Sequence, residues 1–220
     1  MHLNNKSLTE YGGILLAGYT VSGYEIDACT FKGKSRSSLN FLNASTGTKV
    51  LNIPIAFKGD DLTEASQKKS IFEGDAFGKN ELVMDDGLLY SAVLSNIGKS
   101  TYVGTKVIKA EYEFIAIRHG EYKTIVGNTV HCDSTLPYTD CILTATVTAD
   151  RSNYKLGTVT FKEVTAGEVL TVDGINGRIL LNGVPAAERA DWIEFPKLIP
   201  GINHISCDDA LTVEFYPAYF

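Results

Sequence analysis

Short stretches rich in β-branched and aromatic residues recur through the second half of the chain, separated by explicit turn sequences. This alternation of strand and turn signals is typical of antiparallel β-structure. The turns include Asp173-Gly174 and Asn182-Gly183, residue pairs that accept the left-handed backbone angles of tight hairpins. The expected strands are 141–148, 157–161, 169–172, 179–181, 202–206 and 210–216. No segment from residue 129 onward predicts a helix, so an all-β sandwich is expected here.

The first half also contains strand signals, at 18–24, 49–57, 88–95 and 107–118. In the last of these segments apolar residues flank charged ones, which predicts a strand with one face on a core and the other in water. The apolar residues are Val107, Tyr112, Phe114, Ile115 and Ile117, and the charged residues are Lys109, Glu111, Glu113 and Arg118.

Two segments of the first half predict helices. Asp60 and Asp61 can accept hydrogen bonds from the free N–H groups at a helix start, so a helix is expected over 61–73 and is expected to end at Gly74. Its expected apolar stripe is Leu62, Ala65, Ile71 and Phe72. The sequence Ser7-Leu8-Thr9-Glu10 matches a capping box before a stop at Gly12-Gly13.

The composition changes around His119-Gly120, and 220 residues suit two domains of ordinary size. We therefore expect a domain boundary near 120–128, with an α+β domain over 1–122 and a β-sandwich domain over 123–220. No internal repeat is present in the sequence.

Charge and hydropathy exclude several classes of protein. A formal net charge of -6 argues against nucleic-acid binding, which requires a cationic surface to displace counterions from phosphates. The apolar run that begins at Ile14 breaks at Gly18, so we expect no signal peptide, no membrane insertion and folding in the cytosol. The four cysteines are then expected to be reduced, and without a CxxC pair they do not predict a zinc ribbon.

The most specific sequence patterns lie near the C-terminus. They are GEVLTVD at 167–173, ILLNGV at 179–184, FPKLIPGINHI at 195–205 and LTVEFYPAY at 211–219. Their order resembles the C-terminal half of bacteriophage distal tail proteins, including the Phe-Pro-x-Leu-x-Pro-Gly-x-Asn motif of that family. The first half is similar more loosely, at 50–59 with the 61–73 helix and at 81–90.

The resemblance implies a mainly-β fold, with an N-terminal α+β belt domain that is sandwich-like with one helix, followed by a C-terminal galectin-like β-sandwich. It implies a non-enzymatic structural subunit of the tail tip or baseplate, assembled in the host cytoplasm and located in the virion tail. The implied assembly is a homohexameric ring. Its implied partners are the tail tube protein, a tail-associated hub, lysin or fibre protein, and receptor-binding proteins.

The residues themselves predict no catalytic, cofactor-binding or metal-binding site. Nucleophile-elbow, zinc-protease, phosphate-loop and dinucleotide motifs are absent, and the pairs Asp85-Asp86 and Asp208-Asp209 are interpreted as solvated turn carboxylates. One metal-like cluster combines His131-Cys132 with His204 and Cys207. Adjacent strand residues point to opposite faces, so buried free cysteines are favoured over a metal site.

Two alternatives to the tail ring stay open. A carbohydrate-binding module could use Trp192 to stack on a sugar ring, but Arg178, Arg189, Asn203 and His204 are scattered along the sequence. We favour Trp192 packing against the sandwich edge or a neighbouring subunit. The other alternative is a tail-tube subunit, which also forms rings but usually lacks the Phe-Pro-x-Leu-x-Pro-Gly ending.

Overall fold

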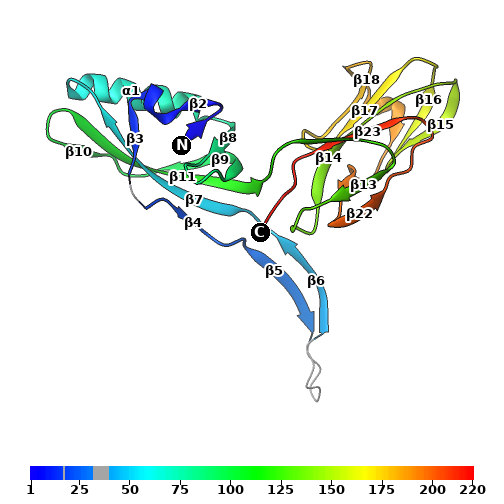
Figure 1. The fold of residues 1–220 in the computed structure, drawn as a ribbon, viewed down its shortest axis with the longest axis horizontal. Helices are drawn as coiled ribbons and strands as arrows, with labels where there is room; N and C mark the ends of the chain where they lie inside the picture. The colour runs from blue at the N-terminus through cyan, green and yellow to red at the C-terminus, as the bar shows by residue number, and fades with distance from the viewer. Residues whose placement is uncertain (17, 32–39) are drawn as a thin grey trace. The chain divides into compact units, whose positions relative to one another are not determined.

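The computed structural model describes residues 1–16, 18–31 and 40–220, and the chain divides into two compact units. The first unit comprises Met1–His119 together with Phe220, and the second comprises Gly120–Tyr219. The expected boundary between residues 122 and 123 lies close to this division. The predicted mainly-β class is confirmed, since strands account for most of the regular structure (Figure 1). No described helix is long and apolar enough to cross a membrane.

In its described part, the first unit is built on an antiparallel sheet of nine strands. Along the sheet the order is β2-β1-β8-β9-β11-β7-β3, with β10 paired to β11 and β4 paired to β7. The strands are β1 (His2–Leu3), β2 (Lys6–Ser7), β3 (Gly13–Leu15), β4 (Thr20–Val21), β7 (Lys49–Lys58), β8 (Lys79–Val83), β9 (Leu89–Ile97), β10 (Thr101–Val103) and β11 (Val107–His119). The segments expected at 49–57, 88–95 and 107–118 are thus β7, β9 and β11, whereas only Thr20–Val21 of 18–24 is a strand.

The helix α1 (Leu62–Asp75) packs on one face of this sheet, which we call the inner face (Figure 1). Asp61 caps it as predicted, because its side chain accepts a hydrogen bond from the N–H of Glu64 at 2.8 Å. The end expected at Gly74 was wrong, since the helix continues to Asp75 and Ala76 is its C-cap. The capping box at Ser7 is also present, and it starts a short 3-10 helix, η1 (Leu8–Tyr11), that Gly12 ends with a φ of 64°.

The aromatic core of the first unit centres on Phe72 of α1. Its ring lies 5.4 Å from that of Tyr11, 5.6 Å from Phe57 and 5.0 Å from Tyr112. Placing Ile71 in the apolar stripe was wrong, because its side chain is 55% exposed. Consecutive helical residues point about 100° apart, so once Phe72 enters the core its neighbour is turned toward solvent.

Strand β11 alternates from Val107 to Ile117, with Ile108, Ala110, Tyr112, Phe114 and Ala116 buried on the inner face. The predicted strand with one face on a core and the other in water is therefore confirmed, but the apolar residues Ile115 and Ile117 lie on the water-facing side. Successive strand residues point to opposite faces, and the small residues Ala110 and Ala116 occupy core positions beneath α1 and its neighbours. The two isoleucines are left on the face opposite α1.

One hairpin of the first unit was not predicted from the sequence. Strands β5 (Ile26–Phe31) and β6 (Asn40–Thr46) pair with each other and, in the described part of the chain, with nothing else. All six residues of β5 are exposed. We call β5 and β6 together the arm.

The second unit, which is described in full, consists of antiparallel sheets that enclose a hydrophobic core of its own. The largest sheet has the order β12-β23-β14-β17-β18-β19, with β21 paired to β14, and the smaller ones are β15-β16-β20 and β13-β22. The strands are β12 (Lys123–Val126), β13 (Thr129–Cys132), β14 (Thr139–Thr146), β15 (Arg151–Leu156), β16 (Val159–Val164), β17 (Val169–Asp173), β18 (Arg178–Leu181), β19 (Val184–Pro185), β20 (Ala190–Asp191), β21 (Lys197–Leu198), β22 (Gly201–His204) and β23 (Leu211–Phe215). A second 3-10 helix, η2, spans Ala187–Arg189.

The two expected glycine turns differ in their physical basis. Asn182 and Gly183 have φ angles of 50° and 78° and join β18 to β19, as predicted. Gly174 does not have a positive φ. It is required there for close approach, since a Cβ would lie 2.8 Å from the carbonyl oxygen of Cys141. The sequence Ala149-Asp150-Arg151-Ser152-Asn153 also predicts a turn, but strand β15 already begins at Arg151, so the last three of these residues lie in the strand.

Candidate interaction surfaces

The face of the first-unit sheet opposite α1 carries an exposed apolar row, and we call it the outer face. Ile115 of β11 lies directly opposite Val93 of β9, which in turn lies opposite Lys79 of β8. Val93, Ile115 and Ile117 are 46%, 42% and 39% exposed. Apolar residues on neighbouring strands form a contiguous patch, and such patches mark interaction surfaces more often than isolated exposed residues do.

The arm is a second unpartnered surface of the first unit. Ile26 and Phe31, which lie at opposite ends of β5, are both 59% exposed. Both long edges of a two-stranded ribbon are unpaired, and natural proteins usually protect such edges with charge or proline. In the sequence of the arm, Asp27 is the single charged residue and no proline occurs. The edges of the arm therefore lack the usual protection of charge and proline.

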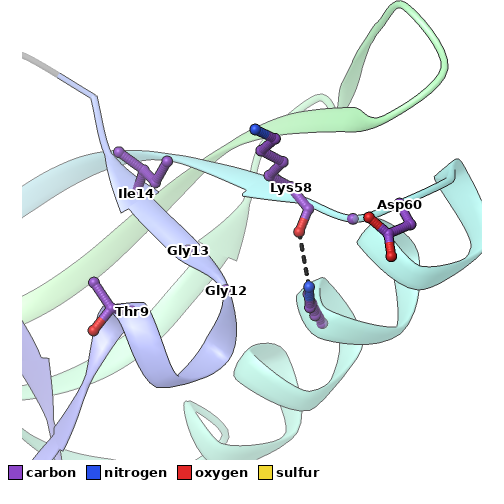
Figure 2. A pocket seen from close by; sticks show the side chains of 8 residues that line it. Thr9, Gly12, Gly13, Ile14, Lys58 and Asp60 are labelled. Atoms are coloured by element: carbon purple, nitrogen blue, oxygen red, sulfur yellow. Dashed lines mark hydrogen bonds between the residues drawn. The ribbon is translucent and has the colours of Figure 1, made fainter.

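An open pocket of about 340 Å³ lies beside the start of α1 (Figure 2). Its lining comes from η1, β3, the end of β7 and α1: Thr9, Gly12, Gly13, Ile14, Lys58, Gly59, Asp60 and Lys68. The ammonium group of Lys68 donates to the carbonyl oxygen of Lys58 at 3.0 Å and pairs with Glu64 at 2.8 Å. Through these contacts the ammonium group of Lys68 stabilises the connection between β7 and α1.

The paired acids take part in structural contacts. The carboxylate of Asp86 accepts a hydrogen bond from the hydroxyl of Tyr19 at 2.5 Å, and that bond lowers the pKa of Asp86. Asp85 pairs with the N-terminal ammonium group. A general acid needs a raised carboxyl pKa, so the lowered pKa of Asp86 suits a fixed anion and not a general acid.

Asp209 differs from the expected solvated turn carboxylate, since only 3% of its side chain is exposed. It accepts a hydrogen bond from the hydroxyl of Thr148, which is the largest cause of its lowered pKa. Its neighbour Asp208 is exposed and pairs with Arg151 at 2.9 Å. Both contacts join loops and strand ends of the second unit.

The four residues of the metal-like cluster point in different directions. His131 is exposed and Cys132 is buried on the other side of β13, as expected for adjacent strand residues. Across the same strand pair, His204 lies beside Thr129 with an Nδ1–Oγ1 distance of 3.2 Å. Cys207 is buried and lies 3.3 Å from the hydroxyl of Tyr154. The described residues contain no group of three or more His, Cys, Asp or Glu side chains placed to hold a metal ion.

Trp192 lies just after β20 and is 44% exposed, with its ring 4.9 Å from that of Phe195. The four polar residues considered with it have separate local roles: Arg178 pairs with Asp173, Arg189 pairs with Glu168, Asn203 bonds the backbone of Ile199, and His204 contacts Thr129. Among the described residues none of the four forms a hydrogen bond or ion pair with Trp192. The expected packing of Trp192 at the edge of the sandwich fits its contact with Phe195.

No protein-family model matches the sequence, and no curated protein sequence matches it. Among solved structures, the crystal structure of the Dit protein of phage SPP1 aligns with a TM-score of 0.70 and 13% identity. The alignment covers 99% of this chain and 98% of that one. SPP1 Dit is described as a paradigm of the hub adsorption apparatus in phages that infect Gram-positive bacteria.

Two structures of the phage P2 baseplate in its activated conformation, with Ca and with Sr, align less well, with TM-scores of 0.49 and 0.48. Both show 12% identity and cover 94% of this chain and 91% of the other. These scores are too low to carry the assignment, which rests on the SPP1 protein. Along nearly its whole length, this chain has the distal tail protein fold that its C-terminal sequence patterns predicted.

Proposed function

We propose that the chain is a non-enzymatic structural subunit of a phage tail tip or baseplate, located in the virion tail. The observation that carries this proposal is the fold shared with SPP1 Dit over 99% of the chain. The sequence adds independent support, because the patterns at 195–205 and 211–219 resemble the same family. Fold alone does not establish function. Further support for a role in assembly comes from the arm and the outer face of the first unit.

The proposed mechanism is assembly. Identical subunits related by rotation form a closed ring through head-to-tail contacts when the rotation divides the circle. The ring is proposed to be a hexamer that joins the tail tube protein to a hub, lysin or fibre protein, with receptor-binding proteins docked on the second unit. The exposed arm and outer face of the first unit support an assembling protein, since both are poorly suited to contact with water.

Light scattering over a range of protein concentrations tests this assembly. Six copies of a 23.9 kDa chain have a mass of about 143 kDa, and a species of that mass that persists on dilution is the expected result. A monomer at every concentration would contradict the ring. A continuous distribution of long polymers would instead favour a tail-tube subunit.

The second candidate function is carbohydrate binding by the second unit, and the observation that favours it is the 44% exposed Trp192, whose ring lies against the partly buried Phe195. An aromatic face can stack on the apolar face of a sugar. A glycan array distinguishes this function from a purely structural one. Binding that Trp192→Ala abolishes, while the mass of the assembly stays unchanged, would establish the lectin activity.

A further inference from the structure

Two histidines of the second unit share one exposed face of the ribbon formed by β13 and β22. The two strands lie side by side (Figure 1) and pair antiparallel, with His131 opposite Ile202 and Thr129 opposite His204. Cys132, which follows His131, is buried in the core, whereas His131 is exposed. Ile202 and His204 are the exposed residues of β22. Residues directly opposite each other share a face, so both histidines lie on the solvent side of the ribbon.

We propose that His131 and His204 together bind one divalent ion of the late first-row transition metals, such as Ni²⁺, Cu²⁺ or Zn²⁺. The opposite directions of adjacent strand residues keep Cys132 out of a site with His131, but they do not separate the two histidines. Imidazole nitrogens suit these ions as ligands. Two protein ligands leave the other coordination positions to water or to a donor from another molecule. Binding at this pair does not depend on the proposed ring.

The positions of the two histidines suit chelation of one ion. Residues diagonal to each other across an antiparallel pair lie about 7–8 Å apart, and long side chains reach across that distance. An ion such as Zn²⁺ lies about 2.0–2.1 Å from each imidazole nitrogen, so the two rings must converge on a point above the ribbon. Both side chains are exposed, so they can turn toward that point without disturbing the core.

Thr129 orients the ring of His204. The hydroxyl oxygen of Thr129 lies 3.2 Å from Nδ1 of His204. When Nδ1 donates its proton to this oxygen, Nε2 carries a lone pair that can bind a metal. Metal-binding histidines usually donate their other ring N–H to such an acceptor, which fixes the tautomer and the ring orientation. Within the part of the chain that the structure describes, the side chain of His131 forms no hydrogen bond or ion pair, so its ring nitrogens can accept a ligand.

Hydrogen bonds hold the ribbon at both ends. Before β22, the side chain of Asn203 donates to the carbonyl oxygen of Ile199 at 2.8 Å and accepts from the N–H of Ile199 at 2.9 Å. Beyond the other end, the N–H of Ile205 donates to the carbonyl oxygen of Asn128 at 2.8 Å. The backbone positions of the histidines are therefore set before a metal binds, and preorganisation of this kind lowers the entropic cost of binding.

Isothermal titration of the full chain with Ni²⁺ tests the site. The wild type should bind one ion per chain at this pair. His131→Ala and His204→Ala should each lower the affinity at least about tenfold, because a single imidazole cannot chelate. Both side chains are exposed, so neither change should disturb folding. His2→Ala is the matched control, because His2 is an exposed strand residue of the first unit, and it should leave the affinity unchanged.

Further variants test the geometry of the pair. Thr129→Val removes the hydroxyl that orients His204 and should weaken Ni²⁺ binding about tenfold. Thr129→Ser keeps the hydroxyl and should bind Ni²⁺ as the wild type does. Ile202→His places a third imidazole directly opposite His131 and should tighten binding.

Three outcomes would overturn the proposal. The first is a wild type that does not bind Ni²⁺, and the second is binding that survives the loss of both histidines. The third is an unchanged affinity in either single variant, which would show that one imidazole binds the ion alone. None of these results changes the mass measured by light scattering, so failure of the metal site and failure of the ring are distinguishable.

Discussion

At the scale of single residues, the four thiols illustrate how position decides chemistry. Cys29 lies on the exposed arm, whereas Cys132, Cys141 and Cys207 are buried in the second unit. Burial raises the pKa of the Cys141 thiol to about 12, because the protein interior disfavours the charged thiolate. Thiolates and not thiols are the reactive species.

A maleimide titration at pH 8 should therefore modify one thiol per native chain and four after unfolding. The physical reason is the burial of the other three cysteines, which keeps the reagent away from their sulfur atoms. Mass spectrometry counts the adducts, and Cys29→Ser should bring the native count to zero. More than one adduct on the native wild type would contradict the burial of the second-unit thiols.

At the scale of elements, α1 contributes to the first unit mainly through one side chain. Phe72 is fully buried among Tyr11, Phe57 and Tyr112, whereas Ile71 beside it is exposed. Replacing a buried phenylalanine with alanine removes its transfer free energy and leaves a cavity. Neither term applies to an exposed residue of the same helix.

Phe72→Ala should lower the free energy of unfolding of the first unit by about 3–5 kcal/mol. The matched change Ile71→Ala should alter it by at most about 0.5 kcal/mol. Urea unfolding followed by circular dichroism measures both. Equal losses in the two variants would show that α1 packs through a different face.

At the scale of the whole molecule, each unit has its own hydrophobic core. One core is built around Phe57, Phe72 and Tyr112, and the other includes Leu143, Val172 and Phe215. Because the cores are separate, the two units can unfold in two cooperative transitions. The whole chain then has no single free energy of unfolding.

Calorimetry should show that Phe72→Ala shifts one transition and Leu143→Ala shifts the other, each by several degrees. Both substitutions remove a fully buried side chain, so each should destabilise the unit in which it lies. A single transition that both variants shift together would mean that the two units unfold as one cooperative body.

The arm was not predicted from the sequence. The sequence of β5 has the aromatic and β-branched residues of a strand. The residues before and after it do not indicate that this strand lies outside the nine-stranded sheet. Whether a strand is covered depends on segments distant in sequence or on other subunits. For the same reason, Val93, Ile115 and Lys79 could not be grouped before the strand register was known.

The sequence by itself determined the mainly-β class, the Asp61 cap of α1, the capping box at Ser7 and the Asn182-Gly183 hairpin. These features depend on backbone angles and hydrogen bonds within a few residues of one another. Only the tertiary structure decided that Phe72 is buried while Ile71 is not, and that Ile115 and Ile117 face away from α1. Which face of an element is buried depends on what a distant part of the chain places against it, and local pattern does not contain that information.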